Sequence, residues 1–227
     1  MVKKSFFLFG IAVGYKNRKK KSNFAHKQTG VTMMWLEIAG VLVGLIYLWL
    51  EYKASVWLWL ANIIMPAIYI FIYLDAGVYA DAGINVYYLL ASIYGWAMWL
   101  RRGDDGGVIS ITRTPRTKVG ALAAVGAVVW AGLYYILTHF TDSTVPVGDS
   151  FTTALSIVAL YMLSHKWVEQ WLVWLVVDLV CCWVYVTKGL YPTAVLYGLY
   201  TVLAWVGYRR WLVIMTEQKS DEKVSDC

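Results

Sequence analysis

The sequence predicts an all-α membrane protein of seven transmembrane helices, arranged as a 3+1+3 parallel internal repeat. The first observation is composition, since 60% of the 227 residues are hydrophobic and 15% are charged. Soluble domains contain about 45–50% apolar and about 25% charged residues. The second observation is a series of long apolar segments, and the third is a similarity between the two halves. This composition excludes an ordinary soluble enzyme, a nucleic-acid-binding domain and a disordered protein.

Seven segments have the length of transmembrane helices, because about 20 helical residues cross the hydrocarbon core. They are 31–50, 57–75, 80–100, 117–138, 149–165, 168–187 and 191–212. The longest polar connection, 101–116, is expected to be an exposed loop. Residues 5–15 are apolar but too few to span, so we interpret them as an interfacial or packed helix rather than a cleavable signal peptide.

The repeat appears when the chain is shifted by 112 residues. Nine of the 41 aligned positions from Trp59 to Trp99 are identical, including Gly95 with Gly207. Two copies of a three-helix unit run in the same direction only if a linker helix joins them, and parallel repeats of this kind build transporters. The alternative is a duplication that retained only a structural bundle. The predicted organisation is an N-terminal segment (1–30), a first repeat (31–100), a loop and linker helix (101–140), a second repeat (141–212) and a polar C-terminal tail (213–227).

Charge predicts the orientation. The loops on the side of the C-terminus carry 11 Lys and Arg residues, and the opposite loops carry only Lys188. The positive-inside rule therefore places the C-terminus in the cytoplasm. The basic N-terminal tail then lies on the outer side.

Asp178 is the sharpest functional candidate. It lies near the middle of the sixth predicted span, where an Asp costs roughly 2.5–3.5 kcal/mol to insert. Helical spacing places Trp167, Trp171, Trp174 and Asp178 on one stripe. Aromatic rings above a carboxylate suit a flat cationic solute, through cation–π contact. The alternative is an Asp that only bonds a neighbouring helix.

The repeat predicts an opposing wall from the second and third spans. Asn62 occupies the place of Trp174, and Pro66 can kink its helix. Tyrosine hydroxyls and amides suit the hydroxyl groups of a ribose. The predicted substrate-binding residues are Asn62, Asn85, Tyr88, Gln170, Trp174, Asp178, Trp183, Tyr197 and Tyr200.

Other aromatic residues and glycines have simpler explanations. Tryptophans at the ends of spans are expected to form an interfacial belt; these are Trp35, Trp49, Trp57, Trp99 and Trp211. Gly95 and Gly207 are expected to allow close helix packing rather than to touch a ligand.

No motif predicts an enzyme. The sequence contains no phosphate-binding loop, and its three histidines lie outside the span centres and pair with no candidate nucleophile. The three cysteines have no metal-ligand spacing, so neither a metal nor another cofactor is expected.

The second half resembles the PnuC family of nicotinamide riboside transporters. The resemblance rests on HKWVEQWLVWLVVDLV (165–180), KGLYPTAVLYGLY (188–200) and GYRRW (207–211), with WLWLANII (57–64) and IYGWAMW (93–99) in the first half. It covers about residues 31–212. Where the family often has Asn in the sixth helix and Glu-Asn-Trp before it, this chain has Asp178 and Glu169-Gln170-Trp171.

The resemblance implies import of nicotinamide riboside, a form of vitamin B3, across a bacterial inner membrane. It implies a fold related to the SWEET sugar transporters, a homotrimer, and facilitated diffusion followed by trapping through a separate cytoplasmic riboside kinase. We expect alternating access around a midplane site. The alternatives are a SWEET-like carrier of another nucleoside or neutral sugar, a membrane-embedded enzyme and a structural subunit.

Overall fold

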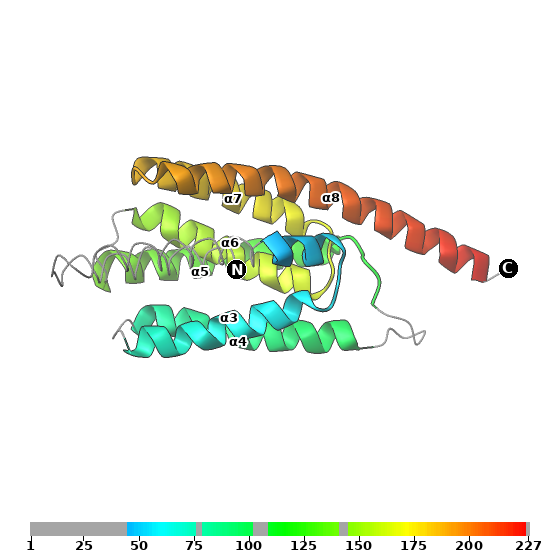
Figure 1. Ribbon diagram of the computed structural model, residues 1–227, viewed down its shortest axis with the longest axis horizontal. Helices are drawn as coiled ribbons and strands as arrows, with labels where there is room; N and C mark the ends of the chain where they lie inside the picture. Colours follow the sequence, from blue (N-terminus) through cyan, green and yellow to red (C-terminus); the bar gives the residue numbers. More distant parts are fainter. Residues whose placement is uncertain (1–44, 76–78, 102–108, 141–144, 226–227) are drawn as a thin grey trace, which may run out of the picture. The chain divides into compact units, whose positions relative to one another are not determined.

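The computed structural model describes residues 45–75, 79–101, 109–140 and 145–225 (Figure 1). Its labelled helices are α3 (Leu58–Asp75), α4 (Tyr79–Leu100), α5 (Arg116–Phe140), α6 (Pro146–Ser164), α7 (Gln170–Thr187) and α8 (Tyr191–Ser225). Residues 45–52 are also helical. The chain divides into two compact units, residues 1–96 and residues 97–227.

The predicted class, a helical membrane protein, is confirmed. Helices α3, α5, α6 and α7 are each long and apolar enough to cross a membrane. Six of the seven predicted spans coincide with α3 to α8. Of the first span, 31–50, only residues from 45 onward are described, and the predicted helix at 5–15 lies outside the described residues. Helix α8 continues to Ser225, so the polar segment after residue 212 is helical as far as that residue.

In the first unit, α3 and α4 form an antiparallel pair. Tyr69 and Tyr73 of α3 pack with Ala82 near the start of α4. At the other end of the pair, the indole of Trp59 covers Gly95 so closely that no Cβ atom would fit there. The absence of a side chain at Gly95 of α4 therefore leaves room for the large ring of Trp59 on α3.

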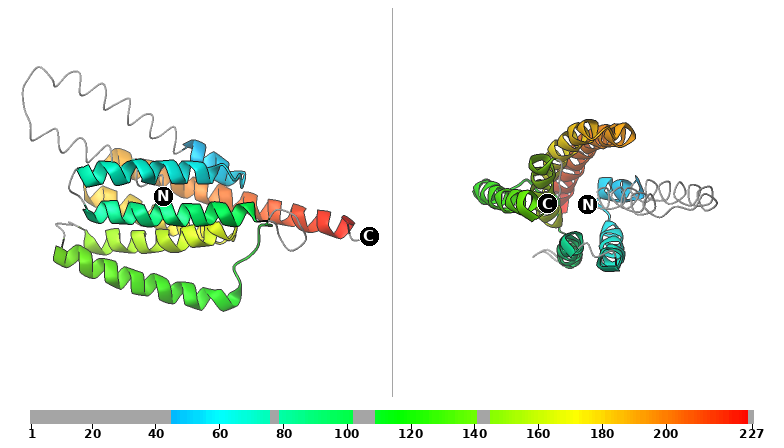
Figure 2. Two further views of the ribbon diagram at one scale, coloured as in Figure 1. Left: turned by 90° about the horizontal axis from the view of Figure 1, so that it is seen from below. Right: turned by 90° about the vertical axis from the view of Figure 1, so that its left-hand side faces the viewer.

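In the second unit, α6 packs against α5 and α7, and α7 packs against α8 (Figure 2). Most residues of α6 are buried, and many of them are small, which lets helices on both sides approach closely. At one end of this layer, the Lys188 ammonium donates to both carboxylate oxygens of Asp149, at 3.1 and 3.0 Å. This ion pair ties the end of α7 to the start of α6.

The hydroxyl groups of α6 find partners within their own helix. Ser150 donates to the Pro146 carbonyl at 2.6 Å, Thr152 to Gly148 at 2.9 Å and Ser156 to Thr152 at 2.6 Å. Hydrocarbon offers no water to replace these bonds, so backbone carbonyls of the preceding turn accept them. These polar side chains serve the structure and have no donor left for a ligand.

The turns that precede α3 and α7 have the same construction, 112 residues apart. Ala54 and Lys166 both have positive φ, at 51° and 52°. In each turn the next amide donates to the carbonyl five residues back, from Ser55 to Leu50 at 2.9 Å and from Trp167 to Met162 at 3.1 Å. Both helices then run for 18 residues.

The chain turns after the end of α7 at Gly189, whose backbone conformation favours glycine. Gly189 has φ +69°, a conformation that costs glycine little because it has no Cβ. The amides of Gly189 and Leu190 donate to the carbonyls of Val186 and Tyr185, at 3.0 and 2.9 Å. These bonds satisfy carbonyl groups at the helix end and turn the chain toward α8.

Two of the predicted belt tryptophans are instead part of the core. Trp99 and Trp211 are 3% and 0% exposed, and their ring centroids lie 6.4 Å apart. The indole of Trp99 donates to the Leu163 carbonyl at 3.1 Å, and Trp171 packs edge-on against Trp211. The belt assignment is wrong for these two, because their partners on other helices cover them. Trp49 and Trp57 are exposed, as a belt requires.

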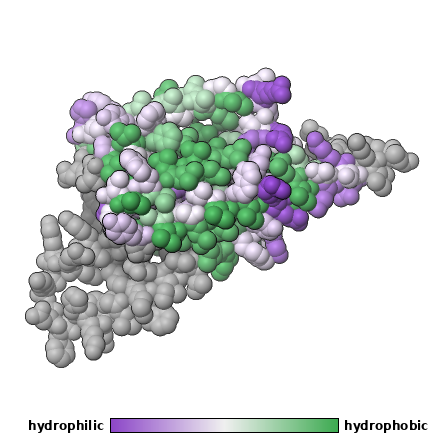
Figure 3. Space-filling model, turned by 90° about the horizontal axis from the view of Figure 1, so that it is seen from above, coloured by the Kyte–Doolittle hydropathy of each residue, from purple (hydrophilic) through white to green (hydrophobic). Residues whose placement is uncertain are grey.

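The outer surface is apolar. On the face in Figure 3, hydrophobic side chains form a broad area and hydrophilic side chains gather toward its ends. Helix α5 shows this most clearly, because Gly126 is its only buried residue. Val125 and Val128 of α5 are 53% and 73% exposed. Such a surface requires lipid or protein around it.

Substitution of Gly207 tests the tryptophan-on-glycine packing. A Cβ atom at Gly207 would lie 2.5 Å from the Trp171 ring, whereas one at Gly198 on the same helix meets nothing within 4 Å. We expect Gly207→Ala to destabilise the fold by about 1–3 kcal/mol through overpacking. Gly198→Ala should be neutral or slightly stabilising. Thermal unfolding in detergent measures both, and equal melting temperatures would contradict the packing.

Candidate functional site

The predicted stripe on α7 is buried. Trp167, Trp171, Trp174 and Asp178 are 7%, 1%, 5% and 1% exposed. Trp171, Trp174 and Asp178 share a face of α7 because residues three and four apart lie above one another on a helix. Trp167 precedes α7 and packs instead with Val158 and Met162 of α6, so the predicted stripe is wrong for this residue. The indoles of Trp171 and Trp174 and the Asp178 carboxylate therefore lie buried along one face of a helix that is long and apolar enough to span a membrane.

Helix α8 adds a group of tyrosines to this stripe. Tyr197 and Tyr200 are buried and pack edge-on with centroids 5.7 Å apart. Tyr185 of α7 stacks on Tyr197 at 5.1 Å. The Asp178 carboxylate lies close enough to interact electrostatically with Tyr197 and Tyr200. The interface of α7 and α8 thus gathers aromatic rings and hydroxyls around one acidic side chain.

Gln170, at the start of α7, has a buried amide that lacks partners. It is 0% exposed, and among the described residues neither its side-chain nitrogen nor its side-chain oxygen has a hydrogen-bond partner. Leaving such groups unpaired costs about 1–3 kcal/mol each. A buried amide in this state suits a ligand that brings its own donor and acceptor.

The first unit buries a second polar group. Asn62 of α3 and Asn85 and Tyr88 of α4 are 0%, 3% and 5% exposed. Ser92 of α4 donates to the Tyr88 carbonyl at 2.6 Å. The polar residues predicted in the first half are therefore buried among the helices of that unit.

Sequence reasoning missed Glu51 and Tyr47 in the same unit. Both side chains are 1% exposed, and the Tyr47 hydroxyl lies beside the Glu51 carboxylate and the Asn62 amide. Glu51 falls just after the predicted first span and was therefore assigned to a connection. Its spacing of four residues from Tyr47 was the available signal, because it places both on one helix face.

Trp183 does not join the other predicted site residues. Its side chain is 58% exposed, whereas the other eight are buried. Trp183 lies five residues after Asp178, which rotates it away from the stripe. The structure therefore places it on the outer face of α7.

A strap formed by residues 109–114 crosses the turn between α6 and α7. Thr112 pairs with that turn through two backbone bonds, to Lys166 at 3.1 Å and from Val168 at 2.9 Å. The Lys166 ammonium donates to the Ile109 carbonyl at 2.9 Å and lies 4.5 Å from the centre of the Trp99 ring. The described part of the predicted exposed loop is thus fixed in place, and Ile111 within it is buried.

Glu169 joins this strap to the first turn of α7. Its carboxylate accepts from the Thr114 amide at 2.7 Å, the Thr114 hydroxyl at 2.9 Å and Arg113 at 3.2 Å. The nearby Tyr208 hydroxyl and the Glu169 carboxylate raise the pKa of Arg113. Because Glu169 directly precedes Gln170, the strap also holds the start of the buried stripe.

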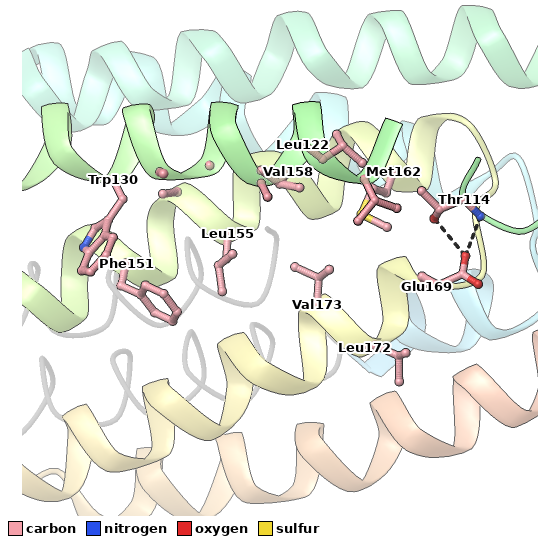
Figure 4. Close-up of a pocket in the computed structure, with 15 residues that line it drawn as sticks. Thr114, Leu122, Trp130, Phe151, Leu155, Val158, Met162, Glu169, Leu172 and Val173 are labelled. Atoms are coloured by element: carbon pink, nitrogen blue, oxygen red, sulfur yellow. Dashed lines mark hydrogen bonds between the residues drawn. The ribbon is translucent and has the colours of Figure 1, made fainter. Parts of the chain in front are cut away.

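The second unit also contains an apolar cavity away from the polar site. It has a volume of about 510 Å³ and lies along α5, α6 and α7 (Figure 4). Leu122, Leu155 and Val158 line it, with Trp130 and Phe151 at one end and Thr114 and Glu169 at the other. None of the predicted site residues lines it, and its walls offer little to a polar solute.

These features define a class of protein, a polytopic membrane transporter: membrane-length helices that bury polar side chains within the bundle. Residues 34–213 match the nicotinamide mononucleotide transporter family, and the chain belongs to that family. The predicted PnuC resemblance is thereby confirmed, and the family is one of transporters, not enzymes. Among the described residues, no three His, Cys, Asp or Glu side chains group as metal ligands.

Named relatives agree with this family. The chain is 23% identical over 216 residues to the nicotinamide riboside transporter PnuC of Escherichia coli, covering 84% of this chain and 90% of that protein. It is 29% identical over 184 residues to the riboflavin/roseoflavin transporter RibM of Streptomyces davaonensis, covering 79% and 85%. The crystal structure of the vitamin B3 transporter PnuC has the same fold, with a TM-score of 0.61, 19% identity and coverage of 95% and 90%.

Removal of the Glu169 carboxylate tests the strap. Glu169→Ala leaves the Thr114 amide and hydroxyl without their acceptor, and we expect a loss of about 1–3 kcal/mol in stability. Glu217→Ala is the matched control, because Glu217 makes only an exposed contact of 3.9 Å with Arg210. Thermal unfolding should separate the two variants, and an equal effect would mean that the strap adds no stability.

The buried ammonium group of Lys166 should make the stability of the protein depend on pH. Burial lowers the pKa of Lys166 from 10.5 to about 8. Between these values the unfolded chain binds more protons than the folded protein, so stability should rise as pH increases from about 8 toward 10.5. Lys166→Met should remove this rise, whereas Lys219→Met, at an exposed position of α8, should keep it. Unfolding measured across this pH range checks the sign.

Proposed function

We propose that this chain transports nicotinamide riboside by facilitated diffusion. The observation that carries the proposal is the buried set on α7 and α8, in which Asp178 lies beside aromatic rings and tyrosine hydroxyls. The riboside joins a permanently cationic pyridinium ring to a ribose. A carboxylate complements the cation, aromatic rings stack on it, and hydroxyls and amides bind the sugar. The PnuC relatives, named for this substrate, support the assignment.

The proposed binding residues are the buried polar and aromatic side chains predicted from the sequence. In the second unit, Trp174 stacks on the pyridinium, Asp178 supplies charge, and Gln170, Tyr197 and Tyr200 provide hydrogen bonds. In the first unit, Asn62, Asn85 and Tyr88 bind the ribose and the carboxamide. The buried amide of Gln170 has no hydrogen-bond partner among the described residues, and this supports the proposal because a bound substrate would supply one. Trp183 is left out because its side chain is exposed.

The proposed mechanism is alternating access by the two three-helix repeats, which the linker helix α5 joins. The matched 18-residue helices α3 and α7 and the matched turns at Ala54 and Lys166 support a 3+1+3 repeat. The contacts of Trp59 with Gly95 and of Trp171 with Gly207 support it further, since all four positions correspond at a shift of 112. The domain boundaries proposed from the sequence follow this repeat.

The cellular setting is also proposed from the family resemblance. The chain resides in a bacterial inner membrane as a homotrimer, with its C-terminus in the cytoplasm. A separate cytoplasmic kinase phosphorylates the imported riboside and so traps it. The excess of Lys and Arg on the loops of one side supports this orientation.

Riboflavin is a second candidate substrate. The RibM relative is 29% identical to this chain, against 23% for the PnuC relatives. A flavin is also a flat ring with a hydroxylated chain, but it carries no positive charge at neutral pH. A buried carboxylate therefore favours the cationic riboside over the uncharged flavin. The two candidate substrates thus differ in charge, and a binding comparison can distinguish them.

Calorimetry on the detergent-purified protein tests the substrate. Nicotinamide riboside should bind, whereas nicotinamide, nicotinamide mononucleotide, riboflavin and glucose should bind far more weakly or not at all. Preferred binding of riboflavin would establish the second candidate, and preferred glucose would establish a sugar carrier. Uptake into vesicles that is unaffected by dissipating proton and sodium gradients would support facilitated diffusion, and loss of uptake would contradict it.

Substitution of Asp178 tests the site. Asp178→Ala removes the carboxylate and its hydrogen-bonding capacity, so we expect riboside affinity to fall at least tenfold, or about 1.4 kcal/mol. Trp174→Ala should also weaken binding, through loss of stacking. Trp205→Ala, at an exposed tryptophan on α8, is the control and should bind as the parent protein does. Unchanged affinity in Asp178→Ala and Trp174→Ala, with the fold intact, would exclude this site.

A further inference from the structure

The apolar cavity between α5, α6 and α7 has the character of a lipid site. Its volume is about 510 Å³, and its walls are almost entirely hydrocarbon, with Leu122, Val158 and Val173 among them. Figure 4 shows these side chains pointing into a trough that runs along the helices. Small residues of α5 and α6 deepen it, namely Ala123, Gly126, Ala127 and Ala154.

The charged and hydroxyl groups of the cavity lie at one end, and they bond each other. Thr114 donates to the Glu169 carboxylate through both its amide and its hydroxyl, at 2.7 and 2.9 Å. At the opposite end, Trp130 and Phe151 pack edge-on with ring centroids 5.4 Å apart. An occupant therefore meets hydrocarbon along its length and a charged group only at the end near Thr114.

The length of the trough corresponds to one leaflet of a bilayer. Its lining on α5 extends from Val119 to Trp130, which is about 16 Å at 1.5 Å per residue. The hydrocarbon core of a bilayer is about 30 Å thick, so one leaflet supplies about 15 Å. A single acyl chain that enters from the end near Thr114 would reach about as far as Trp130.

Positive charge surrounds the same end. Arg113, Arg116 and Lys118 lie within four residues of Thr114 in the sequence, and all three are exposed. Arg113 pairs with Glu169. For Arg116 and Lys118, no ion pair is found within the described part of the chain. Exposed cations beside a membrane-spanning segment attract anionic lipid head groups.

We propose that this trough binds one anionic phospholipid, with an acyl chain between α5, α6 and α7 and its phosphate at Arg116 and Lys118. The lipid would lie beside α5, where all residues except Gly126 are exposed or half-buried. Since Glu169 closes the trough and also holds the start of α7, the lipid would border the strap described above.

The dimensions favour an acyl chain over a helix from a second copy of the protein. A volume of 510 Å³ over about 16 Å gives a mean cross-section of about 30 Å², whereas a helix of about 10 Å diameter needs about 80 Å². A helix could cover the opening but could not enter it. An extended hydrocarbon chain is narrow enough to lie inside.

Native mass spectrometry of the full-length protein tests the proposal with added phosphatidylglycerol or phosphatidylcholine. Ala123 lines the trough, whereas the adjacent Ala124, also exposed on α5, does not. Ala123→Phe should lower phosphatidylglycerol occupancy at least tenfold by filling the trough. Ala124→Phe should keep it within twofold. A thermal melt of each variant verifies that the fold is retained.

Charge is tested separately. The double variant Arg116→Gln and Lys118→Gln should lose the preference for phosphatidylglycerol over phosphatidylcholine. The control, Arg209→Gln with Lys219→Gln on α8, should keep it.

Three results would overturn the proposal. The first is equal lipid binding by Ala123→Phe and Ala124→Phe. The second is no preference for the anionic lipid in the parent protein. The third is that Ala123→Phe, but not Ala124→Phe, forms an oligomer of fewer subunits than the parent protein while its lipid binding is unchanged. That result would mean that a second copy covers the trough.

Discussion

The structure depends on one constraint, that hydrocarbon provides no partner for a polar group. Each buried donor or acceptor must therefore be paired within the protein or await a ligand. The hydroxyls of α6 are paired within the protein, because they donate to carbonyls of their own helix. Gln170 is not, since both ends of its buried amide lack a partner among the described residues. The contrast separates polar residues that build the bundle from those available to bind a solute.

The same constraint explains the strap at the end of the bundle. The turn between α6 and α7 contains Lys166, a buried cation in an unusual backbone conformation. Its ammonium is held by the Ile109 carbonyl and the face of Trp99, and the adjacent Glu169 holds Thr114. A polar connection is thus converted into a fixed support for the first turn of α7. This support lies next to the part of α7 that carries Gln170, Trp171 and Trp174.

Much of the fold and part of the site were predictable from residue order. Spans were found because membrane helices need a minimum apolar length, and the shared face of Trp171, Trp174 and Asp178 followed from helical spacing alone. The prediction failed where neighbours on other helices decide exposure. Trp183 has the same chemistry as Trp174 but lies on the outer face, and Trp99 and Trp211 lie at span ends yet cover one another. Glu51 was missed because it follows an apolar segment by a single residue.

By itself, the sequence determined the class of protein, the positions of most helices and the face of α7 that is buried, because these depend on composition and on contacts within one helix. Tertiary structure alone decided which helices share an interface, since packing joins residues far apart in the chain. It paired Asp178 with the tyrosines of α8 and Glu169 with Thr114. It also left a trough between α5, α6 and α7, because the volume between helices depends on side chains from all three.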